Sequence, residues 1–179
     1  LTKKNFAILR KNVINLPDNQ KVPAQEILGR EKEVLERFKI LFKRKISVIK
    51  TRIHGDFHLG QTLYTGNDFM IIDFEGEPEK TLSERRLKRS PLRDVASMIR
   101  SFHYVAHTSI LKQGTIRVED APTLDPWVEL WYKYTSGTFL KSYLATAKDA
   151  LFVPTEKVEL DILLKAFILE KAVYELGYE

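Results

Sequence analysis

The 179-residue sequence is long enough to bury one ordinary hydrophobic core, so we expect one compact unit or a two-part lobe rather than several domains. The sequence has no cysteine and no apolar stretch near the roughly 20 residues of a membrane span, which excludes disulfides and thiolate metal sites and predicts a cytoplasmic protein without a membrane partner. The formal net charge of +5 favours an anionic partner without showing which.

The first half of the chain contains loop, helix and strand patterns. Residues 1–23 are predicted to be a linker or edge segment, because their prolines and an Asp-Asn pair are typical of a loop. Residues 24–43 carry apolar side chains at helical spacing between charged ones, which predicts an amphipathic helix. Two β-prone runs, at 62–64 and 69–72, flank a Thr-Gly-Asn-Asp turn and predict a hairpin.

The second half is predicted to be helical. Residues 91–107 begin with proline, have an Asp in the first turn and repeat apolar residues at helical spacing. Two further helices are predicted at about 125–148 and 156–176, separated by Pro154. The expected fold class is therefore α+β and mainly helical, with a small β-hairpin beside the loops that carry the chemistry.

The most informative motif is Ile-His-Gly-Asp-Phe-His-Leu-Gly-Gln at 53–61, followed by Asp73 after the hairpin. Phosphoryl transfer needs a group that orients and deprotonates a hydroxyl, and oxygen ligands for Mg²⁺. Asp56 can act as the base, while Gln61 and Asp73 can offer amide and carboxylate oxygens to the metal. The order and spacing match the kinase pattern of Asp, then Asn five residues later, then the Asp of Asp-Phe-Gly. We therefore predict a phosphotransferase that uses ATP and Mg²⁺.

Three segments also resemble a known family: residues 54–61, Ile-Asp-Phe-Glu-Gly-Glu-Pro at 72–78, and Arg-Ser-Pro-Leu-Arg-Asp-Val-Ala at 89–96. They resemble the C-terminal lobe of maltokinases, within the aminoglycoside phosphotransferase-like and protein-kinase-like small-molecule kinases, and the resemblance extends from about residue 25 to the end. Gln61 stands where most of these kinases have Asn, and it is similar to the maltokinase pattern in this respect. The resemblance implies ATP- and Mg²⁺-dependent phosphorylation of maltose to maltose 1-phosphate, with a fused or associated trehalose synthase as a further partner.

The same resemblance implies a sugar-binding surface. Lys171, Tyr174 and Tyr178 share one face of the last predicted helix, and the resemblance places this face against the disaccharide. A mixed surface stripe is the simpler interpretation of that spacing. His58 is also expected to face the sugar, because it follows the expected base by two residues.

Three residues are expected to support the site. His54 and His58 are four residues apart, as in some metal sites, but the intervening glycines argue against a helix that presents both, so His54 is expected to position the loop. Asp94 is expected to hold the loop backbone, although a favourable charge at a helix start would also explain it. Glu75 is expected to be an additional contact to Mg²⁺ or sugar.

The chain has no Gly-x-Gly phosphate loop, and no strand Lys with a helix Glu partner can be placed. Residues 1–179 are therefore expected to form a C-terminal lobe without the N-terminal lobe that grips ATP, and to be inactive alone. Two alternatives stay open. One is a kinase for another sugar, choline or an aminoglycoside, and the other is a non-catalytic docking lobe of a trehalose synthase fusion.

Two other patterns have simple interpretations. The basic run at 83–89 lacks interleaved aromatic residues, so we expect a solvated segment and no nucleic-acid partner. Trp127, Trp131 and Tyr134 recur at helical spacing, which favours a buried core stripe over a platform for sugar stacking.

Overall fold

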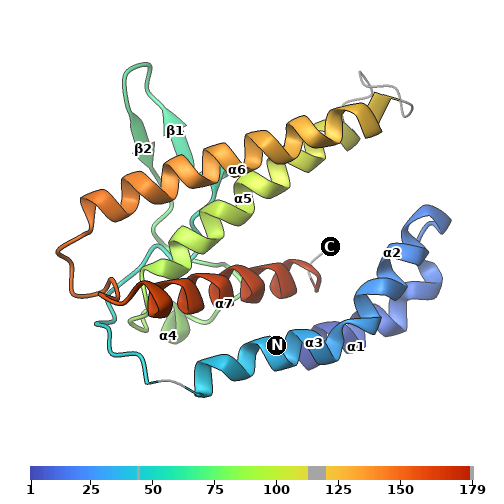
Figure 1. Ribbon diagram of the computed structural model, residues 1–179, viewed down its shortest axis with the longest axis horizontal. Coiled ribbons are helices and arrows are strands. Elements are labelled where there is room, and N and C mark those ends of the chain that lie inside the picture. Colours follow the sequence, from blue (N-terminus) through green and yellow to red (C-terminus); the bar gives the residue numbers. More distant parts are fainter. Residues whose placement is uncertain (44, 113–119, 178–179) are drawn as a thin grey trace. The chain divides into compact units, whose positions relative to one another are not determined.

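The computed structural model describes residues 1–43, 45–112 and 120–177 (Figure 1). The chain divides into two compact units, one made of Leu1–Ser47 and Thr155–Glu179 and the other of Val48–Pro154. Within the described ranges no helix combines the length and the apolar character that a membrane crossing requires. The prediction of a mainly helical fold with one hairpin is confirmed.

The first unit is helical. It contains α1 (Thr2–Asn12), α2 (Asp18–Gly29), α3 (Glu31–Lys39) and α7 (Lys157–Glu175), and α1 packs against each of the other three. Phe6 of α1 is fully buried, and the neighbouring Asn5 donates from Nδ2 to the carbonyl oxygen of Val173 on α7 at 2.7 Å. The early and late parts of the chain therefore share one core.

The loop expected before residue 24 is wrong, because α1 and the start of α2 occupy that segment. Pro17 directly precedes α2 and Pro23 lies near its middle, so these prolines mark a helix rather than a loop. A proline just before the first turn disturbs nothing, since the first N–H groups of a helix have no partner inside the helix. The single helix expected over 24–43 is instead shared between α2 and α3, which meet at Gly29 and Arg30.

The second unit begins with the hairpin. β1 (Thr62–Tyr64) and β2 (Phe69–Ile71) pair antiparallel with Thr62 opposite Ile71, which confirms the predicted hairpin. Before it, Thr51 and Arg89 exchange backbone hydrogen bonds of 2.9 and 2.8 Å. This pairing fixes the start of the 54–61 loop beside the segment that leads from α4 (Leu82–Arg85) into α5.

The core of the second unit lies on α5 (Leu92–Lys112), which packs against α6 (Ala121–Thr146). The 91–107 prediction is confirmed, and the prediction for α6 begins four residues too late. The rings of Phe102 and Phe139 meet edge to face at 5.6 Å between the two helices. The buried apolar residues of α5 recur at helical spacing: Leu92, Val95, Ala96, Met98, Ile99, Phe102 and Ala106.

The buried stripe expected on α6 is wrong. Trp127, Trp131 and Tyr134 are 66%, 46% and 71% exposed, respectively. Trp131 meets Phe102 of α5 only at the edge of its ring, with the ring centroids 6.4 Å apart. Trp127 and Trp131 line an open pocket together with Val105 and Ala106 of α5, so they meet α5 without being buried in the core.

The stability of the chain should depend on pH through His103 of α5. Burial lowers the pKa of His103 to about 4 from 6.5, helped by Arg100 and His107 and opposed by Glu129. Between these values the unfolded state binds more protons than the folded state, so stability is lost as the pH falls from 6.5 towards 4. We expect the urea midpoint to fall over this range and the His103→Gln variant to show a smaller fall. An equally steep fall in the variant would contradict this prediction.

Candidate active site

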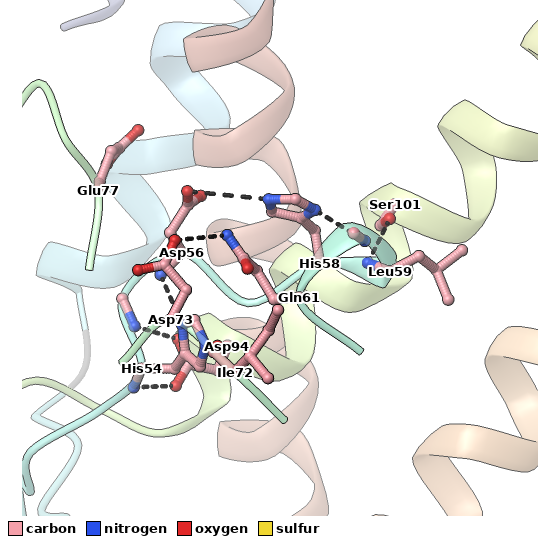
Figure 2. A network of polar contacts seen from close by, with 12 residues as sticks. His54, Asp56, His58, Leu59, Gln61, Ile72, Asp73, Glu77, Asp94 and Ser101 are labelled. Atoms are coloured by element: carbon pink, nitrogen blue, oxygen red, sulfur yellow. Dashed lines mark hydrogen bonds and ion pairs between the residues drawn. The ribbon is translucent and has the colours of Figure 1, made fainter. Parts of the chain in front are cut away.

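His54 joins the two loops of the site (Figure 2). Its Nδ1 accepts from the backbone N–H of Asp56 at 3.4 Å, so its Nε2 carries the proton and donates to the carbonyl oxygen of Ile72 at 2.8 Å. The imidazole is buried, with only 7% of His54 exposed. His54 thus holds the backbone of Asp56 beside the residue that precedes Asp73.

Asp94, in the first turn of α5, anchors the same loop. Its Oδ2 accepts from the N–H of His54 at 2.7 Å and its Oδ1 from the N–H of Gly55 at 2.9 Å. Burial raises the pKa of Asp94, although these two hydrogen bonds and the charges of His54 and Arg93 act in the opposite direction. The loop backbone is therefore fixed to a helix whose apolar face forms the core.

Two glycines let the loops approach each other. Gly55 and Gly76 have φ of 86° and 79°, in the left-handed region that side chains disfavour. A Cβ on Gly76 would lie 3.3 Å from the carbonyl oxygen of His54, and a Cβ on Gly55 would lie 3.6 Å from the Cα of Gly76. The two glycines therefore allow close backbone packing between the segments that carry Asp56 and Asp73.

Replacing Asp94 by Asn should loosen the loop. The carboxamide has one oxygen acceptor, and its NH₂ group would face a backbone N–H, so we expect a loss of about 1–3 kcal/mol in the free energy of unfolding. The amides of His54 and Gly55 should also exchange hydrogen faster. Urea unfolding and hydrogen exchange measure the two effects, with Asp125→Asn on the exposed part of α6 as the control. Unchanged exchange at both amides would contradict this role of Asp94.

Gln61 and Asp73 are in direct contact. The Nε2 of Gln61 donates to Oδ2 of Asp73 at 3.0 Å, which places an amide oxygen and a carboxylate on the same side of the hairpin base. Asp73 has φ of 60°, a conformation that Asp and Asn tolerate better than other side chains. This backbone conformation lies at the turn where the chain leaves β2.

The carboxylate of Asp56 is directed towards His58 (Figure 2). The Nδ1 of His58 accepts from the N–H of Gly60 at 3.1 Å, and its Nε2 lies 3.8 Å from Oδ2 of Asp56. At 20% exposure, the side chain of Asp56 is accessible but not freely mobile in solvent. Because His58 stands directly beside Asp56, it can orient this carboxylate as well as contact a ligand.

The residues present fit a Mg²⁺ ion. Asp73 and Gln61 offer the hard oxygen donors that Mg²⁺ prefers. Glu77, four residues after Asp73, is buried, at 6% exposure, and its carboxylate is paired with Lys80. Glu75, in contrast, is exposed, and none of the contacts described above involves it.

Lys171 and Tyr174, two of the residues expected to contact sugar, lie on α7, in the first unit. The Nζ of Lys171 lies 4.8 Å from the ring centroid of Tyr174, so these two side chains interact with each other. Tyr178 lies outside the described residues. Their role in sugar binding stays a prediction.

Ser101 is a further residue of this site. The Oγ of Ser101 accepts from the N–H of Leu59 at 3.0 Å and so holds the loop to α5. Ser101 lies seven residues after Asp94, on the same face of the helix, and that spacing could have indicated it. No local sequence pattern indicated the burial of Glu77.

Comparison with curated proteins finds similarity to glucosamine kinases, whereas no family model matches the sequence. The glucosamine kinase of Streptacidiphilus jiangxiensis is 30% identical over 95 residues, which cover 52% of this chain and 20% of that protein. The glucosamine kinase of Mycolicibacterium smegmatis is 43% identical over 54 residues, which cover 30% of this chain and 13% of that protein. The matched segments thus span a fifth or less of the length of these relatives.

Solved structures show a similar fold. A glucosamine kinase structure matches 99% of this chain and 40% of its own chain, with a TM-score of 0.73 and 22% identity. A glucosamine kinase in complex with glucosamine, ADP and inorganic phosphate matches 99% of this chain and 41% of its own, with a TM-score of 0.69 and 20% identity. The chain therefore has the fold of the matched part of these enzymes.

Proposed function

We propose that the chain is the catalytic lobe of a longer, ATP-dependent sugar kinase. The observation that carries this proposal is a contact network in which His54 links the backbone of Asp56 to Ile72, next to Asp73, and Gln61 contacts Asp73. Asp56, Gln61 and Asp73 also follow the order and spacing of a phosphotransferase. The similarity to glucosamine kinases supports a sugar as the acceptor and ATP as the donor.

In this proposal Asp56 orients the attacking hydroxyl of the sugar and accepts its proton. Its backbone is fixed by His54, and its carboxylate is flanked by His58, so it is aimed before the sugar arrives. Gln61 and Asp73 hold Mg²⁺, which, when bound, neutralises charge on the phosphate oxygens.

The scaffold around these groups keeps the three side chains in place. Asp94 and Ser101, two turns apart on α5, hold the loop backbone at His54, Gly55 and Leu59. Little covalent chemistry is required of the protein in phosphoryl transfer, so catalysis depends mainly on positioning and electrostatics. A loop fixed to the core helix of its unit suits that requirement.

We propose glucosamine as the first acceptor to test, because the relatives and the similar structures are glucosamine kinases. Maltose is the second candidate, on the strength of the three segments that resemble maltokinases. Association with a trehalose synthase belongs to the maltose alternative alone. In both cases Lys171 and Tyr174 are proposed to bind the sugar.

An acceptor panel tests this proposal. The full-length protein would be assayed for ADP formation with glucosamine, maltose, glucose, choline and an aminoglycoside at equal concentrations. We expect turnover with at least one sugar and none with the two other acceptors. Turnover with choline or the aminoglycoside alone would refute the proposal of a sugar kinase, and turnover with maltose but not glucosamine would decide between the two sugars.

A further inference from the structure

A second group of polar side chains lies between α5 and α6, apart from the candidate active site. His103 and His107 are four residues apart on α5 and therefore share one face of the helix. Glu129 reaches them from α6. One ligand atom from each of the three residues lies within 4.8 Å of the other two. We propose that His103, His107 and Glu129 bind a Zn²⁺ ion.

The side chains are close to the arrangement that such an ion requires. The two imidazole rings have centroids 4.3 Å apart and an interplanar angle of 41°, and Nε2 of His107 lies 3.5 Å from Oε1 of Glu129. Ligand atoms of a tetrahedral Zn²⁺ site with bonds of about 2.0–2.1 Å are about 3.4 Å apart. The 3.5 Å between His107 and Glu129 is already close to this distance. Small side-chain rotations would bring the ligand atom of His103, which lies within 4.8 Å of the other two, to the same distance.

His107 has a polar atom that the protein leaves unsatisfied. Its Nε2 is buried and has no hydrogen-bond partner among the described residues. The 3.5 Å separation from Glu129 is an ion-pair distance only for a protonated imidazole, and it is too long for a good hydrogen bond. A buried nitrogen without a partner is costly, and a metal ion would satisfy its lone pair.

The donor set selects the kind of metal. Two imidazoles and one carboxylate are the donors of three-ligand zinc sites, which keep a fourth position for water or another ligand. Mg²⁺ and Ca²⁺ prefer oxygen ligands throughout. Lys133 lies 3.4 Å from the other oxygen of Glu129, so its positive charge competes with a cation at this place. A bound ion would join α5 to α6 and requires none of the active-site residues.

Zinc binding can be measured on the chelator-treated, dialysed chain. We expect one Zn²⁺ per chain in competition with a chromophoric chelator, and tetrahedral absorption bands when Co²⁺ replaces it. At a hundredfold excess of Zn²⁺ over Kd, Tm should rise by about 5–10 °C. Each of His107→Gln and Glu129→Gln should weaken binding by at least about tenfold, since even outer partners of a metal site contribute that much.

Two matched variants make the test specific. Glu26→Gln, on the exposed surface of α2, should bind Zn²⁺ as the wild type does. Lys133→Gln should bind Zn²⁺ more tightly, because it removes the competing charge without removing a ligand. Far-ultraviolet circular dichroism without metal checks that each variant folds. The proposal would be overturned by the absence of one-to-one binding, by wild-type affinity for Zn²⁺ in His107→Gln or Glu129→Gln, or by loss of binding in His58→Gln.

Discussion

Replacing Asp56 by Asn in the full-length protein should lower kcat by about 10²–10⁴-fold, the usual contribution of a general base. The carboxamide has nearly the same shape, but it cannot take the proton of the sugar hydroxyl. Because Asp56 is held through its backbone by His54, the loop should keep its conformation and the KM for the sugar should change little. Steady-state kinetics with saturating ATP and varied sugar measures both quantities.

The control for this substitution is Asp125→Asn, which makes the same chemical change on the exposed part of α6. It should leave both constants unchanged. Near-normal kcat in Asp56→Asn would show that another group accepts the proton. A rise in KM at constant kcat would instead assign Asp56 to sugar binding.

Replacing Asp73 by Asn should lower the rate by about 10²-fold or more at limiting Mg²⁺, and added Mg²⁺ should restore part of it. Asn tolerates the positive φ of Asp73, so the backbone should not change, and the substitution removes only the charge. The amide of Gln61 also keeps an acceptor at this position. Rates measured over a series of Mg²⁺ concentrations report the effect as a shift in the metal dependence.

The two substitutions should therefore differ in their response to Mg²⁺. Excess metal cannot restore a missing base, so the Asp56→Asn rate should stay low throughout the series. Equal rescue of both variants would contradict the separate roles of Asp56 and Asp73. If the rate of Asp73→Asn depended on Mg²⁺ concentration as the wild-type rate does, Asp73 would not be a metal ligand.

Sequence patterns correctly predicted those helices and strands whose residues follow a clear periodicity. The hairpin follows from two β-prone runs and a four-residue turn, and α5 and α7 follow from apolar residues at helical spacing. Residues 1–23 were misread because prolines at and after a helix start look like loop signals. The stripe of Trp127, Trp131 and Tyr134 was wrongly expected to be buried, because spacing identifies a helix face but not how deeply that face is buried.

In the candidate site, too, the sequence predicted contacts between residues near in the chain but not contacts that depend on packing. The spacing of Gln61 and Asp73 predicted that these two residues would meet, since they lie at the two ends of the hairpin. The hydrogen bond of His54 to Ile72 and that of Ser101 to Leu59 depend on how loops and α5 pack, which no local pattern indicates. The approach of Glu129 to His103 and His107 depends in the same way on the register of α6 against α5.

The proposal of a sugar kinase is tested most directly by following the γ-phosphate of labelled ATP. The full-length protein would be incubated with [γ-³²P]ATP, Mg²⁺ and glucosamine or maltose, and the sugar phosphate separated from ATP and inorganic phosphate. We expect label on the sugar with the wild type, far less with Asp56→Asn, and none with the isolated 179-residue chain. Label that appears only as inorganic phosphate, or that reaches the sugar equally in Asp56→Asn, would contradict the proposal.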